Sequence, residues 1–203
     1  MSSFDLSKPV AVGSDHAGYD LKEELISFLE AKDLAYHDYG THSKDSVDYP
    51  DFAHPVSDAV EKGEAAFGIL LCGSANGVAI TANKHKGIRA AICWGEEIVK
   101  LAREHNNANV ICIPARFVRE GDAEKMLQLF INTPFEGGRH QRRSDGVPDR
   151  RRPALAHVRS VQPRRRADAA RRSGVEPLHA VRRLQEGLEM LEVPAPHAVR
   201  REP

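Results

Sequence analysis

The stretch that decides the fold is Phe67-Gly68-Ile69-Leu70-Leu71-Cys72-Gly73-Ser74-Ala75-Asn76-Gly77. The run from Phe67 to Cys72 is apolar throughout, which is typical of a β-strand covered on both faces. The residues from Gly73 to Gly77 are small or polar, and a helical pattern follows them to about Lys84. A buried strand that turns tightly into a helix is the repeating unit of a parallel α/β sheet.

The same alternation continues on both sides of this stretch. Further β-like runs lie at residues 10–13, 35–39, 90–93 and 110–113, and apolar helical faces lie at residues 21–29, 52–60, 98–105 and 123–130. Such β-α units predict an α/β fold, a Rossmann-like three-layer αβα sandwich with a five-stranded parallel sheet. We expect the flavodoxin-like strand order 2-1-3-4-5, whose switch point lies between the first and third strands.

Composition places the chain among globular proteins. It has 203 residues, 29 basic against 29 acidic side chains, and three cysteines without a CxxC pair. No run approaches the roughly 18 apolar residues of a membrane helix, and the start MSSFDLSKPV lacks the pattern of a secretory signal. The cysteine pattern argues against a disulfide scaffold or a zinc site. We therefore expect a cytoplasmic protein with no membrane partner and no metal.

The balanced charge conceals two unlike segments. Residues 1–140 carry 14 basic against 21 acidic residues, whereas residues 141–203 carry 15 Arg against 8 acidic residues. The second segment lacks Ile, Phe, Tyr and Trp and holds 7 of the 12 Pro, so it has little with which to build a core. We predict a folded domain over 1–143 and an Arg/Pro/Ala-rich tail over 144–203 that is largely disordered or arises from a frameshift.

The switch-point rule selects two loops as the candidate site, 14–18 and 73–77. Cys72 ends the third strand where a helix begins, a position that favours a reactive thiolate, although cysteine is also common as a small buried hydrophobe. The loop after it offers backbone N–H groups to a phosphate or an enediolate oxygen, or is simply a tight turn. Asp15 and His16 form an acid–imidazole pair on the other loop; alternatively, Asp15 caps a helix and His16 is exposed.

Two further candidates lie later in the chain. His105 ends the apolar face of the helix at 98–105, so we expect it to point inward at the carboxyl edge of the sheet, or else to be an ordinary core histidine. Arg139 and Arg143 are four residues apart, and a helical turn would place both guanidinium groups on one face, as suits a phosphate dianion. The alternative is a solvated basic end.

Six blocks of sequence, in order, carry a family resemblance. They are GSDHAG at 13–18, DYPDFA at 48–53, GILLCGSANGVAITANK at 68–84, GIRAAIC at 87–93, EHNNANV at 104–110 and FEGGRHQRR at 135–143. Over about residues 8–143 the chain resembles the type B ribose-5-phosphate isomerases, whose wider family includes galactose-6-phosphate and allose-6-phosphate isomerases. The resemblance implies an aldose–ketose isomerase that works through a cis-enediolate without metal or organic cofactor.

The resemblance also assigns roles to residues. Cys72 takes the place of the catalytic base and His105 that of the acid/base that opens the sugar ring. Substrate contacts are implied for Asp15, His16, Gly73, Ser74, Ala75, Asn76, Gly77, Asn106, Arg116, Arg139 and Arg143. One branch of the family uses a Glu directly after the GxxxG loop, but Val78 stands here, so the base should be Cys72. Arg116 matches an arginine lent to the neighbouring subunit, which implies a homodimer with composite sites, and dimers could pair into tetramers.

Ribose 5-phosphate is the expected substrate, with galactose 6-phosphate and allose 6-phosphate as alternatives. A non-catalytic nucleotide-binding module on the same architecture is a more remote alternative, since fold does not dictate function. The Arg-rich tail could associate weakly with nucleic acid, but it has no aromatic residues for stacking, so we expect no specific nucleic-acid partner.

Overall fold

The computed structural model of the chain describes residues 4–119 and 121–147. The elements are β1 (Val10–Ser14), η1 (His16–Gly18), α1 (Tyr19–Ala31), β2 (Tyr36–Asp38), α2 (Pro50–Glu61), β3 (Gly68–Cys72), α3 (Asn76–Ala82), β4 (Ala90–Ile92), α4 (Glu96–Asn106), β5 (Val110–Pro114), α5 (Asp122–Asn132) and α6 (Arg139–Asp145). Each strand and helix expected from the apolar patterns is present within a few residues. The tail lies outside the described residues from position 148 on, so the division at Arg143 stays a prediction.

The strands form one parallel five-stranded sheet in the order β2-β1-β3-β5-β4. The α/β class and the parallel sheet are confirmed, but the predicted order of the last two strands is wrong. Every residue of β5 is buried, whereas β4 has only three residues, all partly exposed. A strand that is apolar on both faces is stabilised most by an interior position, where helices cover both faces. A short strand exposes few unpaired backbone groups, so it is tolerated at an edge. The switch point between β1 and β3 is unaffected.

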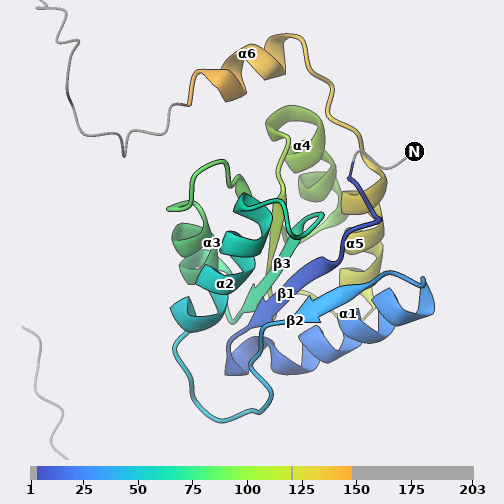
Figure 1. Cartoon of the computed structure of the whole chain (residues 1–203). Helices are drawn as coiled ribbons and strands as arrows, with labels where there is room; N and C mark the ends of the chain where they lie inside the picture. Colours follow the sequence, from blue (N-terminus) through green and yellow to red (C-terminus); the bar gives the residue numbers. More distant parts are fainter. Residues whose placement is uncertain (1–3, 120, 148–203) are drawn as a thin grey trace, which may run out of the picture. The chain divides into compact units, whose positions relative to one another are not determined.

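Two apolar clusters cover the two faces of the sheet. Successive residues of a strand point to opposite faces, so Ile69 and Leu71 of β3 pack with α1, α4 and α5, while Leu70 and Cys72 pack with α2 and α3. Figure 1 shows the resulting layers, with α2 and α3 on one side of the sheet and α1 and α5 on the other. This alternation places the Cys72 side chain on the α2–α3 side.

A buried cation fixes the carboxyl end of α4. Arg103 is only 1% exposed, and its guanidinium lies 4.1 Å from the centre of the Phe4 ring. The same group donates to the carbonyl oxygens of Ala108 and Thr133, so it ties the end of α4 to the end of α5. The free-energy cost of burying this charge is offset by these hydrogen bonds and by the contact with the aromatic ring. The anchored end of α4 carries His105.

Across residues 4–119 and 121–147, the structure contains no helix with the length and apolar character needed to cross a bilayer.

Candidate active site

The loops that follow β1, β3 and β5 surround a cavity of about 390 Å³ at the carboxyl edge of the sheet. Its lining comprises Asp15, His16, Ala17, Tyr49, Cys72, Gly73, Ser74, Gly77, Arg116 and Phe117. The structure therefore brings together the two loops that the switch-point rule selected. Cys72 is 5% exposed, so its thiol belongs to the cavity wall and not to the open surface.

The loop after β1 is held in a defined shape by Asp15 and His16. Asp15 Oδ1 accepts hydrogen bonds from the backbone N–H of Ala17 at 2.9 Å and of Gly18 at 3.1 Å, so it does cap the short helix η1. His16 Nδ1 accepts from the backbone N–H of Val47 at 3.3 Å, and the ring is partly buried. Asp15 thus both caps η1 and lines the cavity, and the capping hydrogen bonds fix the direction of its carboxylate.

The loop after β3 turns sharply into α3. Ala75 has φ of +61°, in the left-handed region, and its side chain is fully buried. The turn directs Gly73, Ser74 and Gly77 toward the cavity, whereas Ala75 and the exposed Asn76 are not in its lining. Of the five loop residues predicted to contact substrate, Gly73, Ser74 and Gly77 therefore line the cavity of the single chain.

Arg116 closes the cavity from the loop after β5. Its backbone N–H donates to Gly73 O at 3.2 Å, and the N–H of Ala115 donates to Cys72 O at 2.9 Å. A Cβ placed on Gly73 would lie 3.2 Å from Arg116 Nε, which shows how closely the guanidinium approaches the loop. The resemblance implied that this arginine serves a neighbouring subunit; here it lines the Cys72 cavity of its own chain.

His105 lies at the opposite edge of the sheet, so the expectation that it points to the carboxyl edge is wrong. A helix between parallel strands runs back across the sheet, and its carboxyl end meets the amino end of the next strand. Ala90 and Val110, the first residues of β4 and β5, are paired, and Asn109 Oδ1 accepts from the N–H of Arg89 at 2.7 Å. The end of α4 is therefore beside the starts of these strands, away from Cys72.

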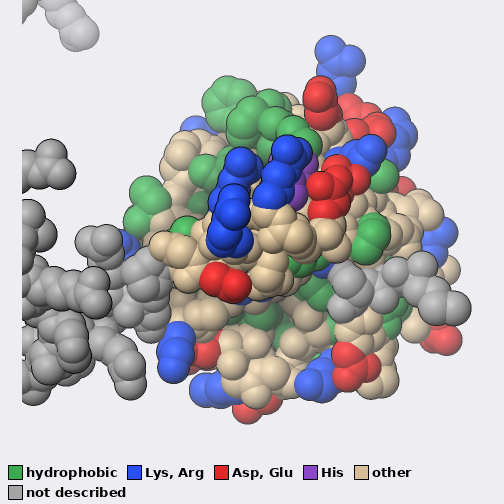
Figure 2. Space-filling view, turned by 90° about the horizontal axis from the view of Figure 1, so that it is seen from above, with side chains coloured by type: hydrophobic (Ala, Val, Ile, Leu, Met, Phe, Trp, Pro, Cys, Tyr) green, Lys and Arg blue, Asp and Glu red, His purple; other side chains and the backbone are tan. Residues whose placement is uncertain are grey.

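A second, larger cavity of about 940 Å³ receives His105. Its lining is Asn83, Lys84, His85, Lys86, Gly87, Ile88, Arg89, Ala90, Ala91, His105, Asn106, Ala108, His140, Arg143, Ser144 and Val147. Seen from above, Lys and Arg side chains gather beside acidic side chains and a histidine on this face (Figure 2). Apart from Ala75, Asn76 and Arg139, the predicted site residues thus line either the Cys72 cavity or this basic His105 cavity.

Arg139 belongs to the surface beside the His105 cavity. The side chain is exposed, and its Nε donates to His140 Nε2 at 3.1 Å. Helix α6 contains both Arg139 and Arg143, so the helical turn that would place both guanidinium groups on one face is present. It packs against α4, which places the two arginines near His105.

Sequence reasoning missed several residues of the two cavities, among them three with aromatic or imidazole rings. Tyr49 and Phe117 line the Cys72 cavity, and the buried His140 lines the His105 cavity. Tyr49 and His140 lie inside the blocks DYPDFA and FEGGRHQRR, so their positions were visible, but no pattern of residue types gave them a role. Phe117 is 72% exposed beside the cavity, and no pattern in the sequence indicates this position.

The other two cysteines are packing residues. Cys93 and Cys112 are fully buried, and all three cysteines are free thiols. Burial raises the pKa of Cys93 to about 12, and burial raises the pKa of Cys112 well above its ordinary value. Neither thiol is suited to proton transfer near neutral pH.

Within residues 4–119 and 121–147, two side-chain groups bring possible metal-ligand atoms within 4.8 Å of one another: His105, Glu136 and His140, and Asp58, Glu61 and His85. In the second group His85 Nδ1 lies 3.0 Å from Asp58 Oδ1, and its Nε2 is 2.8 Å from His54 Nδ1. These contacts make a hydrogen-bonded surface network from α2 to the segment before β4.

Comparisons with known proteins bear directly on this arrangement. Residues 10–147 match the family described as Ribose/Galactose Isomerase. Ribose-5-phosphate isomerase B of Escherichia coli is 39% identical over 140 residues, which cover 69% of this chain and 94% of that protein. A ribose 5-phosphate isomerase structure from Thermotoga maritima superposes with a TM-score of 0.67 at 45% identity, covering 68% of this chain and 96% of that one.

A further solved structure carries a ligand. Ribose-5-phosphate isomerase B of Mycoplasma genitalium, with bound ribulose-5-phosphate, superposes with a TM-score of 0.67 at 42% identity and covers 70% of this chain and 95% of its own. The family match spans the whole of the described sheet and reaches the end of α6. The chain belongs to the ribose/galactose isomerase family.

Proposed function

We propose that this protein interconverts ribose 5-phosphate and ribulose 5-phosphate. The observation that carries the proposal is the Cys72 thiol in the wall of a cavity whose rim is a glycine-rich loop at the start of a helix. The ribulose-5-phosphate bound by the M. genitalium relative supports the choice of a pentose phosphate. Galactose 6-phosphate and allose 6-phosphate are the substrates that the test must exclude.

The chemistry is a proton transfer between neighbouring carbons. In the open-chain aldose, the Cys72 thiolate removes the proton from C2, which gives a cis-enediolate, and the thiol returns the proton to C1 as the hydroxyl proton moves from O2 to O1. The backbone N–H groups of the Gly73–Gly77 loop stabilise the negative oxygen of the intermediate. Val78 is buried and apolar, so it cannot replace the thiol as base.

Phosphate binding and ring opening are assigned to the other cavity. Arg139 and Arg143 supply guanidinium donors to the phosphate dianion, and Asn106 supplies a polar contact. His105 opens the furanose by taking the proton from the C1 hydroxyl and delivering a proton to the ring oxygen. In this scheme Cys72 moves the carbon-bound proton and His105 moves the protons of ring opening, and no metal or organic cofactor takes part.

A single chain does not join these two groups of residues, since Cys72 and His105 line different cavities at opposite edges of the sheet. The proposal therefore includes a homodimer in which the Cys72 cavity of one chain faces the basic His105 cavity of the other. Arg116 then acts beside Cys72 of its own chain, while His105, Asn106, Arg139 and Arg143 act across the interface. Composite sites of this kind make the dimer necessary for full activity.

The test is turnover of ribose 5-phosphate, allose 6-phosphate and galactose 6-phosphate by the full chain, with and without a metal chelator. We expect ribose 5-phosphate to have the highest kcat/KM and the chelator to have no effect. A higher kcat/KM for either hexose phosphate would reassign the substrate. Lack of turnover of all three by a folded dimer would overturn the isomerase mechanism.

A further inference from the structure

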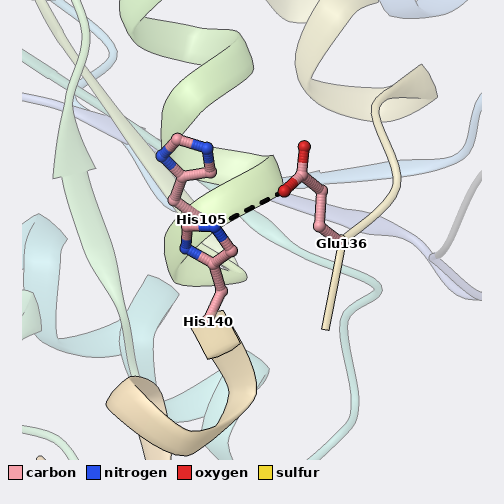
Figure 3. Close-up of side chains that lie close together, drawn as sticks. All are labelled: His105, Glu136 and His140. Atoms are coloured by element: carbon pink, nitrogen blue, oxygen red, sulfur yellow. Dashed lines mark ion pairs between the residues drawn. The ribbon is translucent and has the colours of Figure 1, made fainter. Parts of the chain in front are cut away.

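The rings of His105 and His140 are stacked, with centroids 4.0 Å apart and an angle of 9° between their planes. Figure 3 shows the stack, with His105 from α4, His140 from α6 and Glu136 at the side. His140 is only 4% exposed. A single metal ion would need to lie in both ring planes, which parallel rings do not allow, so the stack is better suited to positioning than to chelation.

One ring nitrogen of His140 faces two groups of opposite charge. Arg139 Nε donates to His140 Nε2 at 3.1 Å, and Glu136 Oε2 lies 3.4 Å from the same nitrogen. A neutral Nε2 has a lone pair and can accept from the arginine, whereas a protonated Nε2–H can only donate, and the carboxylate is then its partner. The protonation state of His140 thus decides whether Arg139 or Glu136 is bound.

We propose that neutral His140 is a positioning residue that holds the Arg139 guanidinium for phosphate binding and releases it on protonation. The bond to His140 uses the Nε–H of Arg139, so the two Nη groups on the other edge can address a phosphate as a pair. This inference rests on the phosphate role of Arg139 in the proposed function.

Burial and most of the surrounding charges favour the neutral form of His140. Burial lowers the pKa of His140, and His105, Arg139 and Arg143 lower it further, whereas Glu136 raises it. The neutral form therefore persists to a lower pH than in an ordinary histidine, and Arg139 is released as the pH falls through this lowered pKa. Other charged or titratable groups in the lining of the shared cavity are Lys84, His85, Lys86 and Arg89.

The direct test is an NMR titration of His140 in the isotope-labelled full chain. Glu136→Gln removes the group that raises the pKa, so the pKa should fall further; Arg139→Gln removes a cation and a donor, so the pKa should rise. Arg142→Gln is the matched control, because this exposed arginine of the same helix is not among the groups that shift His140. Unchanged titration in both Glu136→Gln and Arg139→Gln would overturn the proposal.

Kinetics supply the second readout. His140→Phe keeps an aromatic ring against His105 but has no acceptor for Arg139. Above pH 7 we expect KM for ribose 5-phosphate to rise about three- to tenfold with little change in kcat, as for the net loss of an ordinary hydrogen bond. The ratio of variant to wild-type KM should fall toward one at acid pH, because protonated His140 in the wild-type protein has also lost its hydrogen bond to Arg139.

The substrate phosphate also ionises near pH 6, but it does so equally for both proteins and cancels in this ratio. A ratio that does not change with pH would overturn the positioning role. If wild-type protein fails to turn over ribose 5-phosphate, the proposed function falls, while the NMR titration still decides whether His140 exchanges Arg139 for Glu136.

Discussion

Gly77 lies directly against the ring of Tyr49. A Cβ added to Gly77 would approach the ring atoms of Tyr49 to 2.6 Å, well inside van der Waals contact. Both residues line the Cys72 cavity, so an aromatic ring from the segment before α2 is fitted to a glycine at the start of α3. The contact sets how far the loop that follows Cys72 can move.

Gly77→Ala should therefore lower kcat/KM by about 100-fold, because displacement of the loop by a fraction of an ångström misaligns its N–H groups with the enediolate. Gly95→Ala is the matched control: Gly95 has extended backbone, and a Cβ there meets nothing within 4 Å. The control should retain kcat/KM within about twofold. Equal activity of the two variants would show that the Tyr49 contact does not constrain the loop.

Cys72→Ala should lower kcat by at least about 1,000-fold, since the proton acceptor is lost, while sugar-phosphate binding largely survives. The measurement is steady-state turnover together with calorimetric titration of ribulose 5-phosphate. Cys93→Ala provides the comparison, because it truncates a buried thiol that lies outside both cavities. Retained turnover in Cys72→Ala would refute its role as base.

Alkylation should distinguish the three cysteines in the native protein. With a small thiol reagent at pH 8, we expect Cys72 to be labelled first, because it lines a cavity. The pKa of Cys93 is raised to about 12, so its thiolate is scarce at this pH and appears only as the pH rises further. Mass spectrometry of the peptides gives the rates, and labelling of Cys93 or Cys112 as fast as Cys72 in folded protein would contradict the structure.

A mixing experiment tests the two-chain site. Cys72→Ala and His105→Asn should each be inactive alone, but a mixture of both, dissociated and reassembled in equal amounts, should regain about one quarter of wild-type activity. Half of the dimers then contain one copy of each variant, and each such dimer has one site with both residues intact. No regain of activity in proven heterodimers would mean that Cys72 and His105 do not act together across an interface.

Local patterns in the sequence were sufficient for the architecture. The apolar run that ends at Cys72 predicts a buried parallel strand because both of its faces must be covered, and the structure confirms this. The convergence of Asp15 with the loop after Cys72 follows in turn, since the carboxyl ends of parallel strands meet at one edge. Helix α6, which the apolar patterns did not indicate, provides the helical turn that would place Arg139 and Arg143 on one face.

The exchange of β4 and β5 could not be settled from local patterns. The order depends on which strand is stabilised more by burial at the centre of the sheet. The structure places the fully buried β5 there and the short β4 at the edge. The position of His105 was predicted wrongly for a related reason. Its apolar helix face shows that it points inward, but the direction in which α4 crosses the sheet decides at which edge of the sheet it lies.

The sequence by itself determined the strands, the helices and the loop that carries Cys72, because each depends on neighbours along the chain. Only the tertiary structure decided that Tyr49 meets Gly77, that His140 stacks on His105, and that Cys72 and His105 occupy separate cavities. These relations join residues far apart in the chain, and their distances depend on how the helices pack on the sheet, which no periodicity of residue types records.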